Sequence, residues 1–251
     1  MNFITLTNEN LEKEHICCAI SNNKDCQVAS KKAWLSQRLE EGLVFTKGDV
    51  RGKVFMEYIP AEKAWVPIEA EGYMFIHCFW VSGQYKGQGI SNELLVSCIT
   101  DSKAKGKKGL AVISSKKKLP YLSDGSFLRH KGFQLADTSA PYYELLYLPF
   151  EETATKPSFK VCAKKAEIKE KGWVLYYSQQ CPFTAKYVPL IEEIAKKRGV
   201  DFQVFRYESA QEAQNAPVAS TTYSLFYEGQ LVTHEILSDK KFIKILESKG
   251  L

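Results

Sequence analysis

The sequence predicts a mixed α/β protein built from two units, and three observations lead to this prediction. A glycine-rich turn, Gln84–Ile90, joins an apolar strand to a helix in the middle of residues 1–150. Stretches typical of strands lie on both sides of that turn. A polar, weakly periodic segment then separates them from a second series of strands and helices. We therefore expect a first unit over 1–150, a linker over 151–171 and a second unit over 172–251.

Length and composition agree with two ordinary globular units. The chain has 251 residues, of which 45% are hydrophobic and 25% charged, and its net charge is +5. The N-terminus lacks the basic start and the apolar segment of a signal peptide. No run approaches the ~18 apolar residues that a membrane helix needs. We therefore expect a cytoplasmic protein without a membrane partner.

The first unit is expected to alternate strands and helices. Asn8 or Asn10 can cap a first helix, and Gly42 and Gly132 can end two others. Alternating or continuous apolar residues predict the strands. The strands are expected over 3–7, 43–46, 52–59, 73–81, 109–114 and 142–148, and the helices over 11–20, 27–41, 91–106 and 126–131.

The second unit is expected to run strand, helix, strand, short helix, hairpin and helix. Pro182 suits the first position of a helix, Glu228-Gly229 suits a hairpin turn, and Ser238 can cap the last helix. The strands are expected over 173–178, 201–207, 221–227 and 231–236, and the helices over 182–197, 210–214 and 240–249.

The cysteines favour buried thiols over disulfides or metal ligands. There are seven of them, an odd number, and none form a Cys-x-x-Cys pair. A secreted disulfide framework is therefore not expected. The spacing of Cys and His also differs from that of structural zinc sites, so we expect no metal.

A run of lysines stands out against the mild net charge. Seven lysines and no acidic residue lie between Lys103 and Lys118. A solvated helix end and loop explains the run most simply, and a patch that attracts polyphosphate ligands is the alternative. A nucleic-acid surface would need aromatic or arginine partners that this stretch lacks, so no nucleic-acid partner is expected.

The glycine-rich turn is the main functional signal. A turn that leads from a strand into a helix N-terminus directs several backbone N–H groups at one point, where a pyrophosphate can bind. A P-loop is excluded because no Gly-Lys-Ser/Thr follows. A dinucleotide-binding unit would need three glycines at its first helix and a later acidic residue. The remaining alternative is a turn that only connects two elements.

The pattern Gln84-x-x-Gly87-x-Gly89, followed by Ile90 and Leu94-Leu95, resembles the acyl-CoA-binding motif of the GNAT acetyltransferases. The order of elements over about 1–150 and the Lys131-Gly132-Phe133 exit of a short helix agree with that family. The resemblance implies a mixed, largely antiparallel sheet and acetyl-CoA or coenzyme A as co-substrate, without a metal. It implies cofactor contacts at Phe79, Trp80, Val81, Gln84, Tyr85, Lys86, Gly87, Gln88, Gly89, Ile90 and Ser91, and lysines from Lys103 onward could assist the phosphates.

The catalytic groups of the family are only partly matched. Leu128 occupies the position where many members carry a tyrosine that protonates the leaving thiolate. Tyr121 is therefore the candidate acid, with a water molecule or weak transfer as alternatives. A base is expected among Glu57, Glu69, Glu71 and His77 on or near the central strands. Period-two alternation places His77 between Phe75 and Phe79, where a hydrogen-bonded core histidine is the alternative.

The second unit resembles the start of a thioredoxin or glutaredoxin fold in the segment Trp173–Thr184. Cys181 would lie at a helix N-terminus, which lowers the pKa of a thiol. Thr184 replaces the second cysteine and Pro217 comes too early for the usual proline of the fold, so a disulfide reductase is not expected. A plain capping cysteine and a reactive thiol remain as alternatives.

A GNAT domain followed by such a degenerate thioredoxin-like tail resembles the YoaP-like proteins. The resemblance implies an acetyl-CoA-dependent N-acetyltransferase acting on the amine of a small molecule or peptide. The alternatives are a non-catalytic coenzyme A-binding protein, or a thiol-linked sensor that uses Cys181. A nucleic-acid binder rests on the lysine run alone, and a homodimer is left open.

Overall fold

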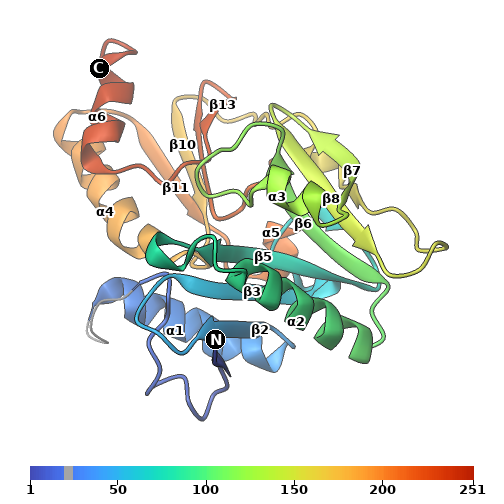
Figure 1. The fold of residues 1–251 in the computed structure, drawn as a ribbon. Coiled ribbons are helices and arrows are strands. Elements are labelled where there is room, and N and C mark those ends of the chain that lie inside the picture. Colours follow the sequence, from blue (N-terminus) through green and yellow to red (C-terminus); the bar gives the residue numbers. More distant parts are fainter. Residues whose placement is uncertain (20–24) are drawn as a thin grey trace.

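The first unit is built on one seven-stranded sheet. The computed structural model describes residues 1–19 and 25–251 (Figure 1). The sheet has the order β1-β2-β3-β5-β6-β8-β7, and β5–β6 is its only parallel pair in the described chain. The predicted mixed, largely antiparallel sheet is therefore confirmed. The strands are β1 (Phe3–Thr5), β2 (Val44–Gly48), β3 (Val54–Pro60), β5 (Tyr73–Val81), β6 (Gly109–Ser115), β7 (Gln134–Ser139) and β8 (Tyr143–Pro149).

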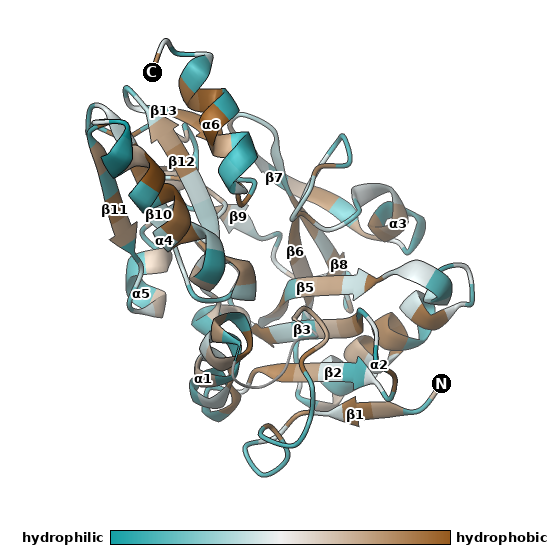
Figure 2. Cartoon of the chain, turned by 90° about the vertical axis from the view of Figure 1, so that its left-hand side faces the viewer, coloured by the Kyte–Doolittle hydropathy of each residue, from teal (hydrophilic) through white to brown (hydrophobic). Residues whose placement is uncertain are grey.

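Each face of this sheet carries its own core. On one face, α2 (Ile90–Ala104) and α3 (Gly125–His130) cover the sheet with buried residues such as Leu94 and Leu128. On the other face, α1 (Cys26–Glu40) and the second unit pack against residues such as Phe45. Figure 2 shows the hydrophobic residues concentrated in the central strands. Both faces are covered, which explains why these strands read as nearly continuous apolar runs.

Strand β5 leaves its neighbour β6 halfway along its length. The two strands pair only from Tyr73↔Gly109 to Ile76↔Val112. Beyond Ile76, β5 continues to Val81 while it pairs with β3 alone, after a register shift at Glu57/Tyr58. Such a bulge bends a strand and re-aims its side chains. The stretch from His77 to Val81 is therefore a sheet edge inside the molecule, and it leads directly into the glycine-rich turn.

The second unit has a four-stranded sheet with helices on it. Its strand order is β11-β10-β12-β13, in which β10 and β11 are parallel and the other pairs antiparallel. The element order agrees with the one predicted, whereas a thioredoxin-like classification stays a prediction. The elements are β10 (Trp173–Tyr177), α4 (Pro182–Lys197), β11 (Phe202–Arg206), α5 (Ala210–Ala213), β12 (Tyr223–Tyr227), β13 (Gln230–Thr233) and α6 (Asp239–Glu247).

The two units share a packed interface. Phe226 and Val218 of the second unit belong to the same buried cluster as Phe45 and Trp65 of the first. The Gln214 amide donates hydrogen bonds to the carbonyl oxygens of Glu62 and Ala64 at 3.1 and 3.0 Å. His234 makes two more hydrogen bonds: its Nε2 donates to the Pro120 carbonyl at 2.9 Å, and its Nδ1 accepts from the Tyr142 hydroxyl at 2.5 Å. A shared core of this kind favours a fixed relative placement of the units.

The segment over 151–171 contains structure that the sequence did not predict. β9 (Ser158–Phe159) pairs with β4 (Ile68–Glu69) in a small sheet, and Phe159 is buried. Asp137 fixes this segment, because its carboxylate accepts a hydrogen bond from Phe159 N and contacts the Lys164 ammonium. The boundaries at 150 and 172 stay predictions, but the connection between them is tied to the first unit.

Two predictions of local structure are wrong. Residues 11–19 form turns with an isolated bridge between Ile16 and Ala19 rather than a helix, and Ile16 and Cys17 are buried in the core; Ile20 lies outside the described residues. β7 was not predicted, since its sequence Gln-Leu-Ala-Asp-Thr-Ser lacks the apolar alternation of a strand. It forms at the edge of the sheet, where one partner, β8, suffices.

We expect the two units to unfold together. Replacing Phe226, which is fully buried, with alanine should lower the free energy of unfolding by about 3–5 kcal/mol through the cavity it leaves. Urea denaturation followed by tryptophan fluorescence and far-UV circular dichroism should give one coincident transition that shifts as a whole. Phe205→Ala, at a position of the same unit that is 42% exposed, is the control and should cost about 1 kcal/mol or less. Two separate transitions, of which only one shifts, would contradict a shared core.

Candidate functional site

The glycine-rich turn has the geometry of an anion cradle. Gly87 and Gly89 have φ angles of +76° and +79°, a region that residues with a Cβ adopt with strain. Gly89 is the N-cap of α2, and a Cβ built at either glycine would meet no atom within 4 Å. The turn therefore needs glycine for its backbone conformation, and its glycines face open space.

The backbone N–H groups of this turn are available to a ligand. Within the described chain, the N–H groups of Gly87, Gln88, Gly89 and Ile90 donate to no backbone carbonyl. The turn is held instead by the Gln88 side chain, whose amide donates to the Gln84 carbonyl at 2.6 Å. Four N–H donors at the positive end of a 15-residue helix form a favourable site for a phosphate group.

The lysine run does not surround this cradle as a whole. Lys103 lies in the last turn of α2, roughly 20 Å from Ile90 at 1.5 Å per residue. Lys105 and Lys107 are paired there with Asp101 and Glu62. These lysines therefore lie at the end of α2 opposite to the cradle, and assistance to the phosphates by lysines from Lys103 onward stays a prediction. Lys53 lies beside the unpaired end of β5, because its ammonium is 4.2 Å from the centre of the Trp80 ring.

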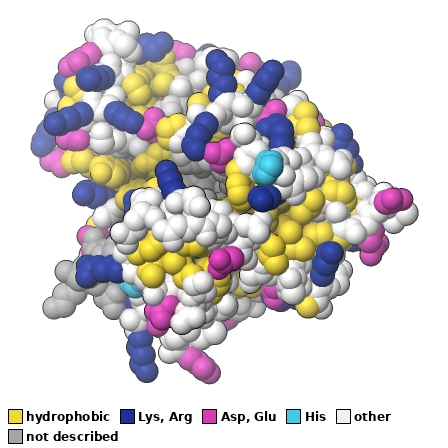
Figure 3. Space-filling view, in the orientation of Figure 1, with side chains coloured by type: hydrophobic (Ala, Val, Ile, Leu, Met, Phe, Trp, Pro, Cys, Tyr) yellow, Lys and Arg dark blue, Asp and Glu magenta, His cyan; other side chains and the backbone are white. Residues whose placement is uncertain are grey.

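A small cavity opens where β5 and β6 separate. Its volume is about 50 Å³, several times what one water molecule needs. Figure 3 shows this side of the molecule hollowed between the second unit and the first, with lysine and arginine side chains at the margin. The cavity is lined by Val66, Phe75, Ile76, His77 and Ile113 of the first unit, by Tyr121, Leu122 and Ser123, and by Gln180, Ala219, Ser220, Thr221 and Thr222 of the second.

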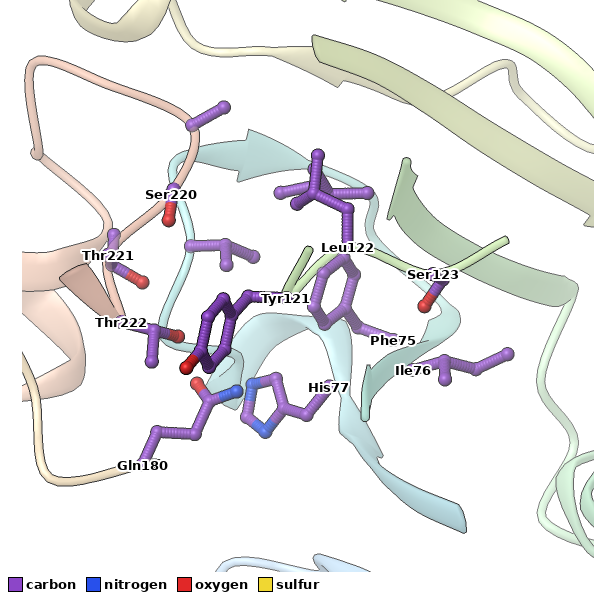
Figure 4. A pocket seen from close by; sticks show the side chains of 13 residues that line it. Phe75, Ile76, His77, Tyr121, Leu122, Ser123, Gln180, Ser220, Thr221 and Thr222 are labelled. Carbon is purple, nitrogen blue, oxygen red and sulfur yellow. The ribbon is translucent and has the colours of Figure 1, made fainter. Parts of the chain in front are cut away.

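Two sequence-predicted candidates, His77 and Tyr121, meet at this cavity. Figure 4 shows the Tyr121 hydroxyl directed toward the Gln180 amide, beside the His77 ring. Tyr121 has a φ of +61°, in the left-handed region, and 48% of its surface is exposed. Burial raises the pKa of Tyr121 to about 12, so its hydroxyl is protonated at neutral pH and can donate a hydrogen bond. Leu128, in contrast, is buried in the core under α3.

Behind the cavity lies a buried ion pair that the sequence analysis did not single out. The Lys31 ammonium donates to Glu57 Oε2 at 2.6 Å and to the Gln180 carbonyl at 2.7 Å, and both charged side chains are almost fully buried. Burial by itself would raise the pKa of Glu57, but the charge of Lys31 and the contact with His77 bring it below its usual value. Glu57 is therefore ionised, with Oε2 bonded to Lys31 and Oε1 3.4 Å from His77 Nδ1.

His77 is fixed on both sides of its ring. Its Nε2 accepts the backbone N–H of Trp65 at 3.4 Å, and its Nδ1 lies 3.4 Å from Glu57 Oε1. Burial lowers the pKa of His77, so the ring is neutral at pH 7, with its proton on Nδ1 toward Glu57. The arrangement corresponds to the hydrogen-bonded core histidine rather than to a free base. Glu69 and Glu71 are exposed and do not line the cavity.

Cys181 lies at the N-cap of α4, where burial governs the pKa of its thiol. Its backbone lies at the N-cap, and its side chain makes no capping hydrogen bond. Burial raises the pKa of Cys181 to about 11, against the effect of the Phe183 N–H and of Lys31. The expectation that the helix N-terminus lowers this pKa is therefore wrong, because loss of solvation outweighs the helix end. Cys18 and Cys78 are close enough to interact electrostatically with it, and burial raises the pKa of both.

Lys31 and Gln180 are the residues that sequence reasoning missed. Lys31 is one of two adjacent lysines in α1, and either could have been the solvated one. Gln180 belongs to a loop of the other unit, 149 residues away from Lys31. The only local signal was Glu57, a single acid in the apolar strand Val54–Pro60, because such a residue must find a partner when it is buried.

Removing one partner of the ion pair should be costly. Glu57→Gln leaves the Lys31 ammonium buried without its counter-charge, and we expect a loss of about 3–5 kcal/mol in the free energy of unfolding. Adding Lys31→Met should restore part of this loss. Since the folded pKa of Glu57 lies below the usual 4.5, the wild type holds this stabilisation above pH 4.5 and loses it as pH falls further.

Urea denaturation at pH 7 and at pH 4 measures this effect, and the difference between wild type and Glu57→Gln should shrink at pH 4. Glu69→Gln, at an exposed position, is the control and should change the free energy of unfolding by about 0.5 kcal/mol or less. If Glu57→Gln loses no more free energy of unfolding at pH 7 than Glu69→Gln does, the ion pair does not stabilise the site.

Cys181 should react slowly with alkylating reagents. With a pKa of about 11, its thiolate fraction at pH 8 is about one in a thousand. Mass spectrometry after timed alkylation should show Cys181 modified well after Cys26 and Cys162, which are exposed. Its rate should rise about tenfold per pH unit up to pH 9.5, and Cys181→Ser identifies its peptide. An alkylation rate of Cys181 that stops rising near pH 8.5 or below would support the reactive-thiol alternative instead.

Within the described residues, no helix is both long and apolar enough to cross a bilayer, and no group of side chains is arranged to hold a metal ion. 

Comparison with known proteins places the chain among acetyltransferases. A family model described as YoaP-like matches residues 201–244. The uncharacterized N-acetyltransferase YoaP of Bacillus subtilis (strain 168) is 47% identical over 249 residues, which are 99% of this chain and 99% of that protein. 

Several solved structures are also similar. A GNAT-family acetyltransferase from Staphylococcus aureus Mu50 is 15% identical, covering 60% of this chain and 99% of its own, with a TM-score of 0.42. The PaiA N-acetyltransferase of Thermoplasma acidophilum, in complex with coenzyme A, is 15% identical over 60% of this chain and 100% of its own, with a TM-score of 0.40. A GNAT acetyltransferase of Brucella melitensis, in complex with acetyl-CoA, is 12% identical over 60% of this chain and 88% of its own, with a TM-score of 0.37.

The relative from Bacillus subtilis aligns with this chain almost from end to end, so the similarity covers both units. The predicted acyltransferase activity class is confirmed by it. The chain belongs to the YoaP family of N-acetyltransferases.

Proposed function

We propose that the protein transfers an acetyl group from acetyl-CoA to an amine of a small molecule or peptide. The observation that supports this most strongly is that the cavity, the unpaired edge of β5 and the glycine-rich turn follow one another along one strand. The β5 edge from His77 to Val81 begins at the cavity and ends at the free N–H groups of the glycine-rich turn. A coenzyme A molecule has the same order of parts: an acetyl thioester, an extended arm and a pyrophosphate.

In this arrangement the turn from Gln84 to Ser91 holds the pyrophosphate. The arm lies along Phe79, Trp80 and Val81 as an added strand, because this edge is not paired with β6. Lys53, beside Trp80, adds positive charge near this edge. The thioester then reaches the cavity at His77.

Tyr121 would assist the reaction as a hydrogen-bond donor. Its pKa of about 12 keeps the hydroxyl protonated, so it can stabilise negative charge on the thioester or on the leaving sulfur. A thiol has a pKa near ~8.5, so a phenol of higher pKa gains nothing by giving its proton away entirely. The acetyl acceptor enters from the side of the second unit, whose loops contribute five of the thirteen lining residues of the cavity.

The thiol-linked alternative is less well supported. Burial keeps the Cys181 thiol protonated, and Cys181 does not line the cavity. A thiol carrier would need an accessible thiolate at this point. We therefore retain Cys181 as a helix-capping residue near the site rather than as the reactive group.

A matched pair of glycine variants tests the cradle. Gly87→Val and Gly106→Val both place a β-branched residue at a positive φ, +76° and +67°, in open space. Both should lose similar stability, but only Gly87 belongs to the cradle. Loss of two or more charge-assisted hydrogen bonds should weaken acetyl-CoA binding by Gly87→Val about 100-fold or more. Isothermal calorimetry of the full chain measures this, and equal affinities for the two variants would mean that the phosphates bind elsewhere.

A further inference from the structure

The acid–base side chains at the cavity are already committed to one another. Glu57 holds Lys31 at 2.6 Å, and His77 places its ring between Glu57 and the Trp65 N–H. The Lys31 ammonium also donates a hydrogen bond to the Gln180 carbonyl at 2.7 Å. A proton taken up by His77 would have to displace the N–H of Trp65 or cross to Glu57. These groups are therefore built to hold the site together rather than to accept a proton from a substrate.

The polar groups that face the cavity from the second unit are neutral. Gln180 is only 8% exposed, and its Oε1 has no hydrogen-bond partner among the described residues. Figure 4 shows this amide at the cavity between Tyr121 and His77, and the hydroxyl-bearing residues Ser220, Thr221 and Thr222 lie on the same side. Glu235, whose negative charge helps to raise the pKa of Tyr121, is paired with Lys241. An ammonium group at Gln180 would thus find a carbonyl oxygen, not a carboxylate.

We propose that the acetyl acceptor is an amine of low basicity, such as the α-amino group of an amino acid or peptide, which enters as the neutral free base with its N–H donated to Gln180 Oε1. This inference rests on the proposed acetyl transfer and specifies the acceptor at the same site. Gln180, contributed by the second unit, is then the residue that positions the acceptor nitrogen.

The reaction balances without a protein base. The nitrogen lone pair of the neutral amine forms a bond to the thioester carbonyl carbon, and the carbon–sulfur bond breaks, with its electron pair leaving on sulfur. The nitrogen then gives up one proton, and the leaving thiolate takes one to become the free thiol of coenzyme A. The products are one amide and one thiol. The Gln180 carbonyl accepts a hydrogen bond while positive charge builds on the nitrogen.

The basicity of the amine decides how much of it can react. At pH 7 an α-amino group with a pKa near 7.9 is neutral in about one molecule in nine, and an ε-amino group with a pKa near 10.4 in about one in 2,500. The greater nucleophilicity of the ε-amine offsets part of this difference. A site that supplies no base should still favour the α-amine by about tenfold or more at pH 7.

Two forms of one lysine amide give a size-matched test: one blocked at the ε-amine, the other blocked at the α-amine. We expect the full-length protein with acetyl-CoA to show a kcat/KM at pH 7 about tenfold or more higher for the free α-amine. The logarithm of kcat/KM should rise with unit slope up to about pH 8 for the α-amine and up to about pH 10 for the ε-amine. An aromatic amine and a hydrazine extend the set of weakly basic acceptors.

Variants of Gln180 test its contact with the acceptor. Gln180→Leu should raise the KM for the α-amine about fivefold, the value of one hydrogen bond, and leave acetyl-CoA binding unchanged. Gln180→Glu supplies a carboxylate and should move the preference toward the ε-amine by about tenfold or more. Gln230→Leu, at an exposed glutamine of the same unit, is the control and should alter neither.

The outcomes separate this inference from the function on which it rests. Failure of acetyl-CoA to bind in calorimetry would overturn the proposed function. Binding of acetyl-CoA with preferred turnover of the ε-amine would overturn the low-basicity acceptor alone. So would a pH profile of kcat/KM that falls below the same pH, between 6 and 7, for both amines, because it would indicate a base of the protein. Binding of acetyl-CoA without turnover of any weakly basic amine would do the same.

Discussion

The buried ion pair between Lys31 and Glu57 is the constraint on which the rest of the structure depends. Lys31 comes from α1, Glu57 from β3 opposite the bulge that His77 forms in β5, and the second acceptor of the ammonium is the Gln180 carbonyl in the second unit. Burying two charges is costly unless the geometry is good and the remaining hydrogen bonds are made. The buried ammonium therefore has both of its acceptors only when the three elements are assembled together, which joins the two units at the point where the cavity forms.

Strand β5 connects the ion pair to the cavity and to the glycine-rich turn. Next to Glu57 the pairing of β3 and β5 shifts register, and His77 is directed toward Glu57. One residue earlier, at Ile76, β5 stops pairing with β6. The strand then runs as an open edge to the turn at Gly87 and Gly89. A single element thus spaces the cavity from the anion cradle, and the register near Glu57 determines that spacing.

Much of the fold could be predicted because its signals are local. Glycines between a strand and a helix predicted the cradle, and the apolar runs predicted the central strands. The helix over 11–20 was wrong because tertiary contacts of Ile16 and Cys17 override its helical pattern. The lowered pKa expected for Cys181 was wrong for a related reason: the helix end is a local effect, whereas the loss of solvation that raises the pKa depends on what packs over the thiol.

The sequence by itself determined most of the order of elements, the glycine-rich turn between a strand and a helix, and Tyr121 and His77 as candidate residues of the site. Only the tertiary structure decided what these residues do. It buried Lys31 against Glu57, fixed both sides of the His77 ring, and brought Gln180 from the second unit to the cavity. The physical reason is that turn geometry depends on neighbouring residues, while desolvation and ion pairing depend on residues far apart in the chain.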